Sequence, residues 1–197
     1  GAGGRRGGSA AAPVKALVAG LTAVANAVAG VDARAAEREA QRLSEEDTRE
    51  PISPQQVLEG VRADFVDNSY LWTGAISRDV FDEACRFTDP TLSFVGLQTF
   101  EKNMEGLTPW VERLVRRDTR ECALLSAKLD EDTRTVTARW RMVGDFVWGA
   151  RLDLEGTTVF SFREQERGGR IFSYDEVWHT PPARALLQLV TPYRRPG

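Results

Sequence analysis

Histidine and cysteine are scarce in this chain of 197 residues, which has one histidine, His179, and two cysteines, Cys85 and Cys122. Structural zinc sites draw their ligands mainly from these two residue types, and small disulfide-stabilised scaffolds are rich in cysteine. The composition therefore excludes a His- or Cys-rich metal cage and a disulfide-stapled fold. The sequence also lacks GxGxxG, Walker A, HExxH, GxSxG and CxxC motifs. We therefore expect no metal site and no cofactor.

The chain has no excess of positive charge. It carries 26 Lys and Arg residues against 29 Asp and Glu residues, for a net charge of −3. Nucleic-acid-binding domains are typically basic, with Lys and Arg gathered on one face. We therefore expect no nucleic-acid partner. The hydrophobic fraction of 42% and the charged fraction of 28% fit a folded domain with its own core.

The N-terminal part lacks aromatic residues, and all 17 aromatic residues lie from Phe65 onward. Residues 1–31 also lack acidic residues, contain Arg5, Arg6 and Lys15, and end in an uncharged, Ala-rich run over 16–31. This composition is typical of organelle transit peptides, and the run is short and weakly apolar for a membrane span. We predict a targeting segment and charged linker over 1–50, a domain over 51–192 and a tail over 193–197. The alternative is an Ala-rich helix that belongs to the mature protein.

Local patterns predict helices first and strands second. Ser53, Pro54 and Gln56 form a capping box with proline at the first helical position. Apolar residues at steps of three and four predict a second long helix over 97–114, kinked or interrupted at Pro109. A short helix is predicted over 77–84, and Asp89-Pro90 marks a turn between two short strands in 85–96. Further strands are predicted at 120–129, 133–143, 157–164 and 170–179, and a final helix at 182–190. This order predicts an α+β fold in which helices pack on one face of a twisted antiparallel sheet.

Three stretches resemble a known family: YLWTG at 70–74, CRFTDPTLSF at 85–94 and SYDEVW at 173–178. They are similar to an uncharacterised family of plant, algal and cyanobacterial proteins within the nuclear-transport-factor-2-like, or SnoaL-like, superfamily. The resemblance covers roughly residues 55–190. It implies a cone-shaped α+β barrel and, for eukaryotic members, a chloroplast location. That location is the stroma, or the thylakoid if the N-terminal apolar run is a second signal. The superfamily contains isomerases, cyclases, dehydratases, epoxide hydrolases, ligand carriers and protein-binding modules, so the fold does not decide the activity.

The last predicted strand offers a carboxylate among aromatic residues. Phe172, Tyr174, Glu176 and Trp178 share one face if the strand is regular. If that face is enclosed, burial would raise the pKa of Glu176, which could then act as a general base or acid. If the face is outside, Glu176 would pair with an arginine of the neighbouring strand and the aromatic residues would form an oligomer contact. If the odd-numbered face points inward, the polar candidates are instead Asp175 and His179, because a slip of one residue exchanges the two faces.

Other candidates surround this strand in the predicted sheet. Asp89 would either cap its turn or lie at the mouth of the cone as a second catalytic carboxylate. Arg141 could steer a substrate oxygen. The residues that we expect to bind a ligand are Trp140, Arg141, Trp148, Tyr174 and Trp178.

The absence of an evident acid–base pair or metal site favours a plastid accessory protein that is not itself a catalyst. It would bind an apolar small molecule or a protein partner in or on the cone-shaped domain. One alternative is a SnoaL-like isomerase or lyase that uses Glu176 or Asp175 as base. Another is a structural subunit of a photosynthetic or membrane-associated complex. A homodimer, or membership of a larger assembly, would suit an exposed aromatic sheet face.

Overall fold

The computed structural model describes residues 33–193, so the targeting segment predicted in residues 1–31 lies outside the described residues. Helix α3 (Pro54–Val66) begins at the predicted capping box: Ser53 Oγ accepts the Gln56 amide, and the Gln56 side chain accepts the Ser53 amide. A single turn, α4 (Tyr70–Thr73), and a short 3-10 turn, η1 (Arg78–Val80), follow. Helix α5 (Leu97–Leu114) runs through Pro109 as one element.

Six strands form one sheet in the order β2-β1-β6-β5-β4-β3. Their bounds are Phe81–Thr88 (β1), Ser93–Val95 (β2), Glu121–Asp130 (β3), Thr135–Asp145 (β4), Arg151–Phe162 (β5) and Ile171–Trp178 (β6). All neighbouring pairs are antiparallel except β1 and β6, which run parallel. The predicted α+β class and the helices-on-sheet arrangement are thereby confirmed.

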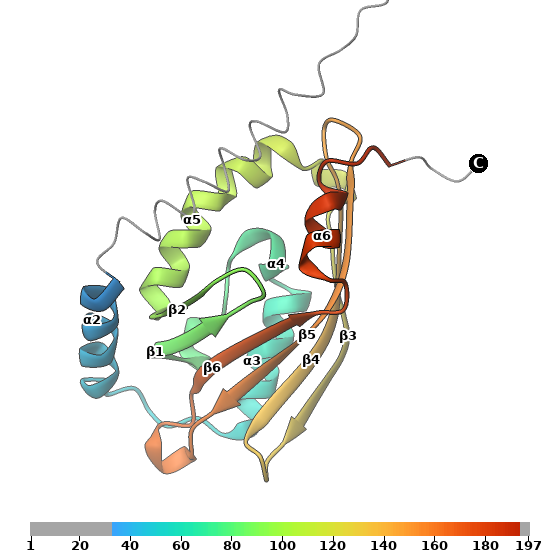
Figure 1. The fold of residues 1–197 in the computed structure, drawn as a ribbon. Coiled ribbons are helices and arrows are strands. Elements are labelled where there is room, and N and C mark those ends of the chain that lie inside the picture. Colours follow the sequence, from blue (N-terminus) through green and yellow to red (C-terminus); the bar gives the residue numbers. More distant parts are fainter. Residues whose placement is uncertain (1–32, 194–197) are drawn as a thin grey trace, which may run out of the picture.

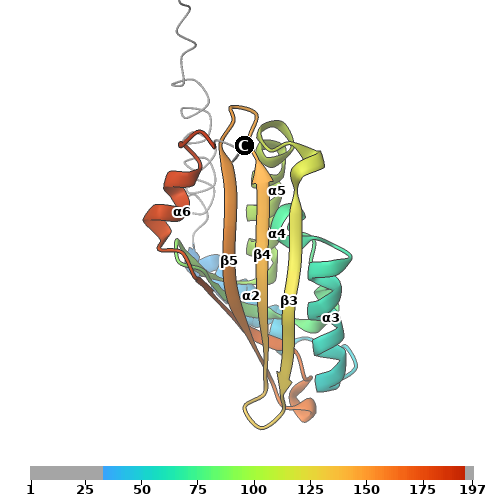
Figure 2. The same ribbon diagram turned by 90° about the vertical axis from the view of Figure 1, so that its right-hand side faces the viewer.

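The sheet curves around α3, α4 and α5 (Figure 1). Turned by 90°, the molecule shows β3, β4 and β5 side by side with α5 behind them, and the short helix α6 (Pro182–Gln188) at one side (Figure 2). The main core lies between the helices and the inner face of the strands, where Phe65, Phe81 and Trp140 are almost fully buried. A curved sheet closed by helices on one side leaves room for a cavity at its open end.

The prediction of a helix over 77–84 is wrong beyond residue 80. Residues 81–84 belong to β1, which pairs parallel with β6, including Phe81 opposite Ile171. The charged stretch reads as a helix locally, but Asp82 is buried in the sheet and accepts a hydrogen bond from Arg163 Nε at 2.8 Å. Pairing between segments about 90 residues apart therefore overrides the local preference.

The residues before α3 are attached to the domain. Helix α2 (Ala33–Glu45) buries Ala40 against the start of α5, and Ile52 N donates to Gly168 O at 3.1 Å. The buried Arg170 donates to the carbonyl oxygens of Glu50 and Asp79 at 2.9 and 3.1 Å. Residues 33–50 thus form a largely exposed helix followed by a loop that is hydrogen-bonded to the rest of the domain. Within residues 33–193, no helix is both long and apolar enough to cross a membrane.

Candidate functional site

A β-bulge decides which residues of β6 point into the cone. The pairing between β5 and β6 shifts between Ser161 and Phe162, so that Ile171 pairs with Phe162 and Ser173 with Ser161. Ile171 is therefore buried, Phe172 is exposed on the outer face, and Tyr174 is buried again. The predicted shared face is wrong for Phe172, whose ring stacks under the Arg163 guanidinium instead. It holds for Tyr174, Glu176 and Trp178, which all line one cavity.

That cavity, which we call the cone cavity, has a volume of about 290 Å³. Apolar and aromatic side chains from α4, β1, the β1–β2 turn, β2, α5, β4, β5 and β6 line most of it: Tyr70, Leu71, Phe87, Leu92, Phe94, Phe100, Met104, Leu107, Trp140, Met142, Leu154, Tyr174 and Trp178. Phe87 stacks on Phe94 and Phe100 with ring centroids 5.4 and 4.6 Å apart. Ligand pockets commonly measure about 300–1,000 Å³ and are lined mainly by apolar groups. The cone cavity lies just below the lower end of that range.

Glu176 is the titratable centre of the cone cavity. The Tyr174 hydroxyl donates to its Oε2, and Trp178 Nε1 donates to its Oε1 at 2.7 Å. The Tyr70 hydroxyl lies 3.0 Å from that of Tyr174, which extends the hydrogen-bonded chain to α4. Burial raises the pKa of the Glu176 carboxyl above its ordinary value, and the charge of Asp89 adds to this effect. The hydrogen bonds from Tyr174 and Trp178 act in the opposite direction. The carboxyl is therefore oriented by two donors and is easier to protonate than one in water.

Asp89 has the turn role that the sequence offered as one alternative, and it also lies at the rim of the cone cavity. Its Oδ1 accepts the backbone amides of Thr91 and Leu92 at 2.6 and 3.0 Å, and the Thr91 hydroxyl at 2.5 Å. These contacts hold the β1–β2 turn in shape at the mouth. Asp89 thus stabilises the turn and brings negative charge to the site, and its Oδ1 atom already accepts three hydrogen bonds.

The structure removes two predicted ligand-binding residues from the cone cavity. Arg141 lies on the opposite face of β4 from Trp140, and its guanidinium pairs with Asp153 at 2.8 and 2.6 Å. Trp148 belongs to a second apolar cluster with Phe146, and its Nε1 donates to Leu189 O at 2.8 Å. Neither residue lines the cone cavity. Arg141 faces away from the cone cavity because successive residues of a regular strand point to opposite faces of the sheet. Trp148 lies outside the cavity because it belongs to the turn after β4.

Trp140 has the predicted position in the wall of the cone cavity. It is 1% exposed, and its Nε1 donates to Thr158 Oγ1 at 2.9 Å. Its ring lies over Gly156 of β5, where an added Cβ atom would come within 2.3 Å of the indole. The glycine therefore makes room for the tryptophan ring.

Sequence reasoning missed Tyr70 and Asn103 as lining residues. Tyr70 belongs to the YLWTG stretch, which carries the family resemblance, but the sequence indicated no function for this residue. Asn103 lies on the inward face of α5, and its position three residues after Phe100 was the available signal. Among residues 33–193, no group of three or more His, Cys, Asp or Glu side chains is placed to hold a metal ion.

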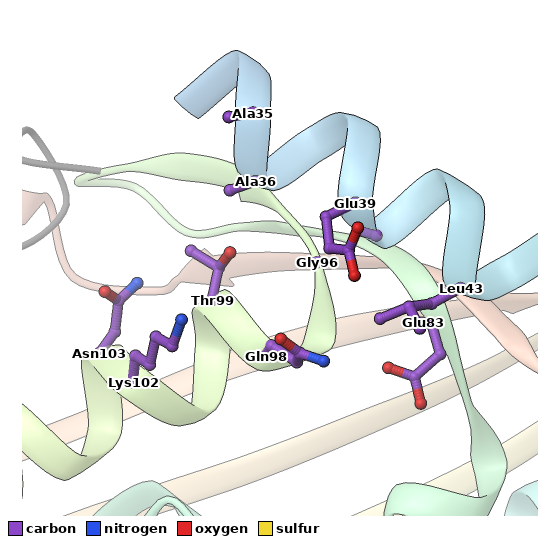
Figure 3. A pocket seen from close by; sticks show the side chains of 11 residues that line it. Ala35, Ala36, Glu39, Leu43, Glu83, Gly96, Gln98, Thr99, Lys102 and Asn103 are labelled. Atoms are coloured by element: carbon purple, nitrogen blue, oxygen red, sulfur yellow. The ribbon is translucent and has the colours of Figure 1, made fainter. Parts of the chain in front are cut away.

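A second hollow lies between α2 and the first turns of α5, with a volume of about 410 Å³ (Figure 3). We call it the α2 groove. It is larger than the cone cavity, but its two carboxylates, Glu39 and Glu83, already form ion pairs with Arg42 and Arg78. Figure 3 shows Thr99, Lys102 and Asn103 projecting from α5 beside it. Because Glu176 and its tyrosines lie in the cone cavity, that cavity is the candidate functional site.

The fold is of the nuclear-transport-factor-2-like (NTF2-like) type. It resembles Bal32a from a soil-derived mobile gene cassette, with a TM-score of 0.50, 18% identity and coverage of 70% of this chain and 98% of that one. It also resembles an NTF2-like protein from Anabaena variabilis, with a TM-score of 0.46, 21% identity and coverage of 68% and 97%. It resembles as well an NTF2-like protein of unknown function from Burkholderia pseudomallei, with a TM-score of 0.48, 13% identity and coverage of 71% of this chain and 99% of that one. At these identities the likeness concerns the fold alone.

Residues 55–172 match the family described as "Uncharacterized conserved protein (DUF2358)". The match spans more than half of the chain, and the protein belongs to this family. No curated protein sequence matches the chain. The predicted membership of an uncharacterised family and the predicted NTF2-like fold are confirmed, whereas the place of this family in the NTF2-like superfamily and the range of organisms named with it stay predictions.

Proposed function

We propose that this protein binds a small, mainly apolar molecule in the cone cavity. The observation that carries the proposal is the cavity itself: a space of about 290 Å³ walled by aromatic and aliphatic side chains around one oriented carboxyl group. A site used only to pack a core would be filled by side chains, because protein interiors are close-packed. The polar groups at Glu176 would orient the molecule, and the apolar walls would supply most of the binding free energy.

A blocking variant tests this proposal. Leu92 lies in the β1–β2 turn and lines the cone cavity, so Leu92→Trp should fill the cavity mouth without disturbing the backbone contacts of Asp89. Val177→Trp adds a tryptophan on the exposed outer face of β6 and serves as the control. Equilibrium dialysis with acetylnaphthalene should show saturable binding to wild type and Val177→Trp, and none to Leu92→Trp. Equal binding by all three proteins, or binding by none, would reject a ligand site in the cone.

Native mass spectrometry of protein purified gently from its source provides an independent measurement. A co-purifying molecule of low mass, absent from Leu92→Trp expressed in the same cells, would support the ligand-carrier proposal. A protein of unmodified mass held in a complex with other chains would favour the role of a structural subunit. The same spectrum would distinguish a homodimer from a mixed assembly.

Glu176 favours a second candidate function, an isomerase or lyase that uses a carboxylate base. Burial raises the pKa of Glu176, and a base with a pKa nearer neutrality is better suited to proton transfer at carbon. Its carboxylate would take a proton from a carbon next to a carbonyl group and return one to the substrate. Exchange of deuterium from D₂O into the methyl group of acetylnaphthalene, followed by NMR, measures this step directly.

The matched variants are Glu176→Gln, inside the cone, and Asp175→Asn, on the exposed face of the same strand. A base role predicts faster exchange with wild type and Asp175→Asn than with Glu176→Gln, while binding of acetylnaphthalene is kept by all three. Exchange that equals the solvent rate with every protein would reject the base and leave the binding proposal intact.

The plastid location is a separate proposal supported by the composition of residues 1–31, which are rich in Gly and Ala, basic and without acidic residues. Fusion of residues 1–50 to a fluorescent protein tests it in plant cells. Fluorescence in chloroplasts is the expected outcome, and fluorescence confined to the cytosol would contradict the proposal.

A further inference from the structure

Asn103 is distinguished from the other polar residues around the cone cavity by a side-chain nitrogen that has no hydrogen-bond acceptor. It is 7% exposed, and its Nδ2 atom is buried without a partner among the described residues. A buried amide without a partner loses its hydration and gains nothing in return, at a cost of about 1–3 kcal/mol. Since buried polar groups are nearly always satisfied, such an atom points to a missing acceptor.

The other polar side chains of the cavity lining are already engaged within the described part of the chain. Glu176 is held by Tyr174 and Trp178, and Tyr70 by Tyr174. The remaining polar groups also have partners: Thr88 with Ser93, Asp89 with Thr91, and the Trp140 indole with Thr158. Among the described residues that line the cone cavity, the Asn103 amide is thus a buried hydrogen-bond donor that still lacks an acceptor, whereas the carboxylates can only accept when ionised.

The charges around the cone cavity define the chemistry of that molecule further. Its described lining residues include the carboxyl groups of Asp89 and Glu176 and no Lys, Arg or His. A carboxylate or phosphate placed there would meet like charge with no compensating cation, which is strongly unfavourable away from water. A neutral molecule with a carbonyl oxygen avoids this repulsion and supplies the acceptor that the amide lacks.

We infer that Asn103 orients the ligand by donating a hydrogen bond from its side-chain amide to the carbonyl oxygen of a neutral, apolar molecule held in the cone cavity. The inference rests on the proposed function and narrows it, because it excludes fatty acids and other organic anions as ligands. Asn103 borders both hollows, and the broad terminal torsion of asparagine allows its amide to face either of them. The cone cavity is the favoured side because its lining is mainly apolar, whereas the lining of the α2 groove includes charged side chains such as Glu83 and Lys102.

Three probes of similar shape test the inference by equilibrium dialysis: acetylnaphthalene, isopropylnaphthalene and naphthoate. Wild-type protein should bind the ketone about tenfold more tightly than the hydrocarbon and should not bind the carboxylate. In Asn103→Leu, whose side chain has the same branched arrangement of heavy atoms and no amide, the affinity for the ketone should fall to that for the hydrocarbon. Hydrocarbon binding should be unchanged, which also shows that the variant is folded.

The outcomes separate this inference from the proposed function. Absence of binding by any probe to wild type would reject both. Equal binding of ketone and hydrocarbon to wild type, or a ketone preference that survives Asn103→Leu, would reject the role of Asn103 and leave the cavity as a binding site. Tight binding of naphthoate that persists in Leu92→Trp would also overturn it, because it would locate the ligand in the α2 groove beside Lys102.

Discussion

Asp64 on α3 makes the stability of this domain depend on pH. The residue is 3% exposed, and its carboxyl accepts hydrogen bonds from the Ser77 backbone amide and hydroxyl, both at 2.6 Å, and from the Asn68 side-chain amide at 3.1 Å. Burial raises the pKa of Asp64 from 3.8 to about 6, although the hydrogen bonds from Ser77 and Asn68 act in the opposite direction. The folded protein therefore holds this proton more tightly than the unfolded chain does.

The sign and size of the effect follow from this difference. A carboxyl whose pKa is higher in the folded state contributes stability below its unfolded pKa, and that contribution is lost as the pH rises through the folded pKa. For Asp64 the window runs from about pH 4 to about pH 6. A difference of roughly two pKa units corresponds to about 3 kcal/mol of unfolding free energy.

The perturbation is Asp64→Asn, which keeps an oxygen for Ser77 and cannot ionise. Urea unfolding at several pH values between 4 and 7 should show wild type losing stability relative to the variant as the pH rises, by up to about 3 kcal/mol. Glu59→Gln, on the exposed side of the same helix, is the control. A difference between wild type and Asp64→Asn that stays constant over this range, or that changes in the opposite direction, would refute the reasoning.

Two further perturbations probe the walls of the cone cavity. Gly156→Ala should cost about 1–3 kcal/mol in chemical denaturation, because the new Cβ would lie 2.3 Å from the buried ring of Trp140. Gly106→Ala, where no atom lies within 4 Å of an added Cβ, should instead stabilise α5 by up to about 1 kcal/mol, and equal effects at both glycines would contradict this packing argument. Trp178→Phe should raise the pKa of Glu176 further by removing one donor, as measured by NMR of ¹³C-labelled glutamate. A pKa unchanged or lowered by the substitution would show that the indole does not stabilise the ionised carboxyl.

The sequence predicted the elements whose signals are local. The capping box at Ser53 sets the start of α3, and the spacing of apolar residues predicts the full length of α5. The turn at Asp89 separates β1 from β2 as expected. These features depend on contacts between residues a few positions apart, and such contacts can be inferred from one segment without the rest of the chain.

Of the candidate site, the sequence identified the tyrosine, glutamate and tryptophan of β6 and the tryptophan of β4. It could not choose the inward face of β6, because the bulge opposite Ser161 and Phe162 depends on pairing with a second strand. It overlooked Asn103, although the spacing from Phe100 indicates the inward face of α5, and it could not show that the amide has no partner.

The sequence by itself thus determined the order and type of most elements, the boundary of the aromatic core and the residue types available for chemistry. Only the tertiary structure decided that residues 81–84 form a strand beside β6, that Arg141 faces away from the cone cavity, and that Tyr70 and Asn103 join it. The physical reason is that helix caps and periodicity are settled within one or two turns of chain. The faces of strands, the burial of a carboxyl and the satisfaction of an amide are settled by segments far apart in the sequence.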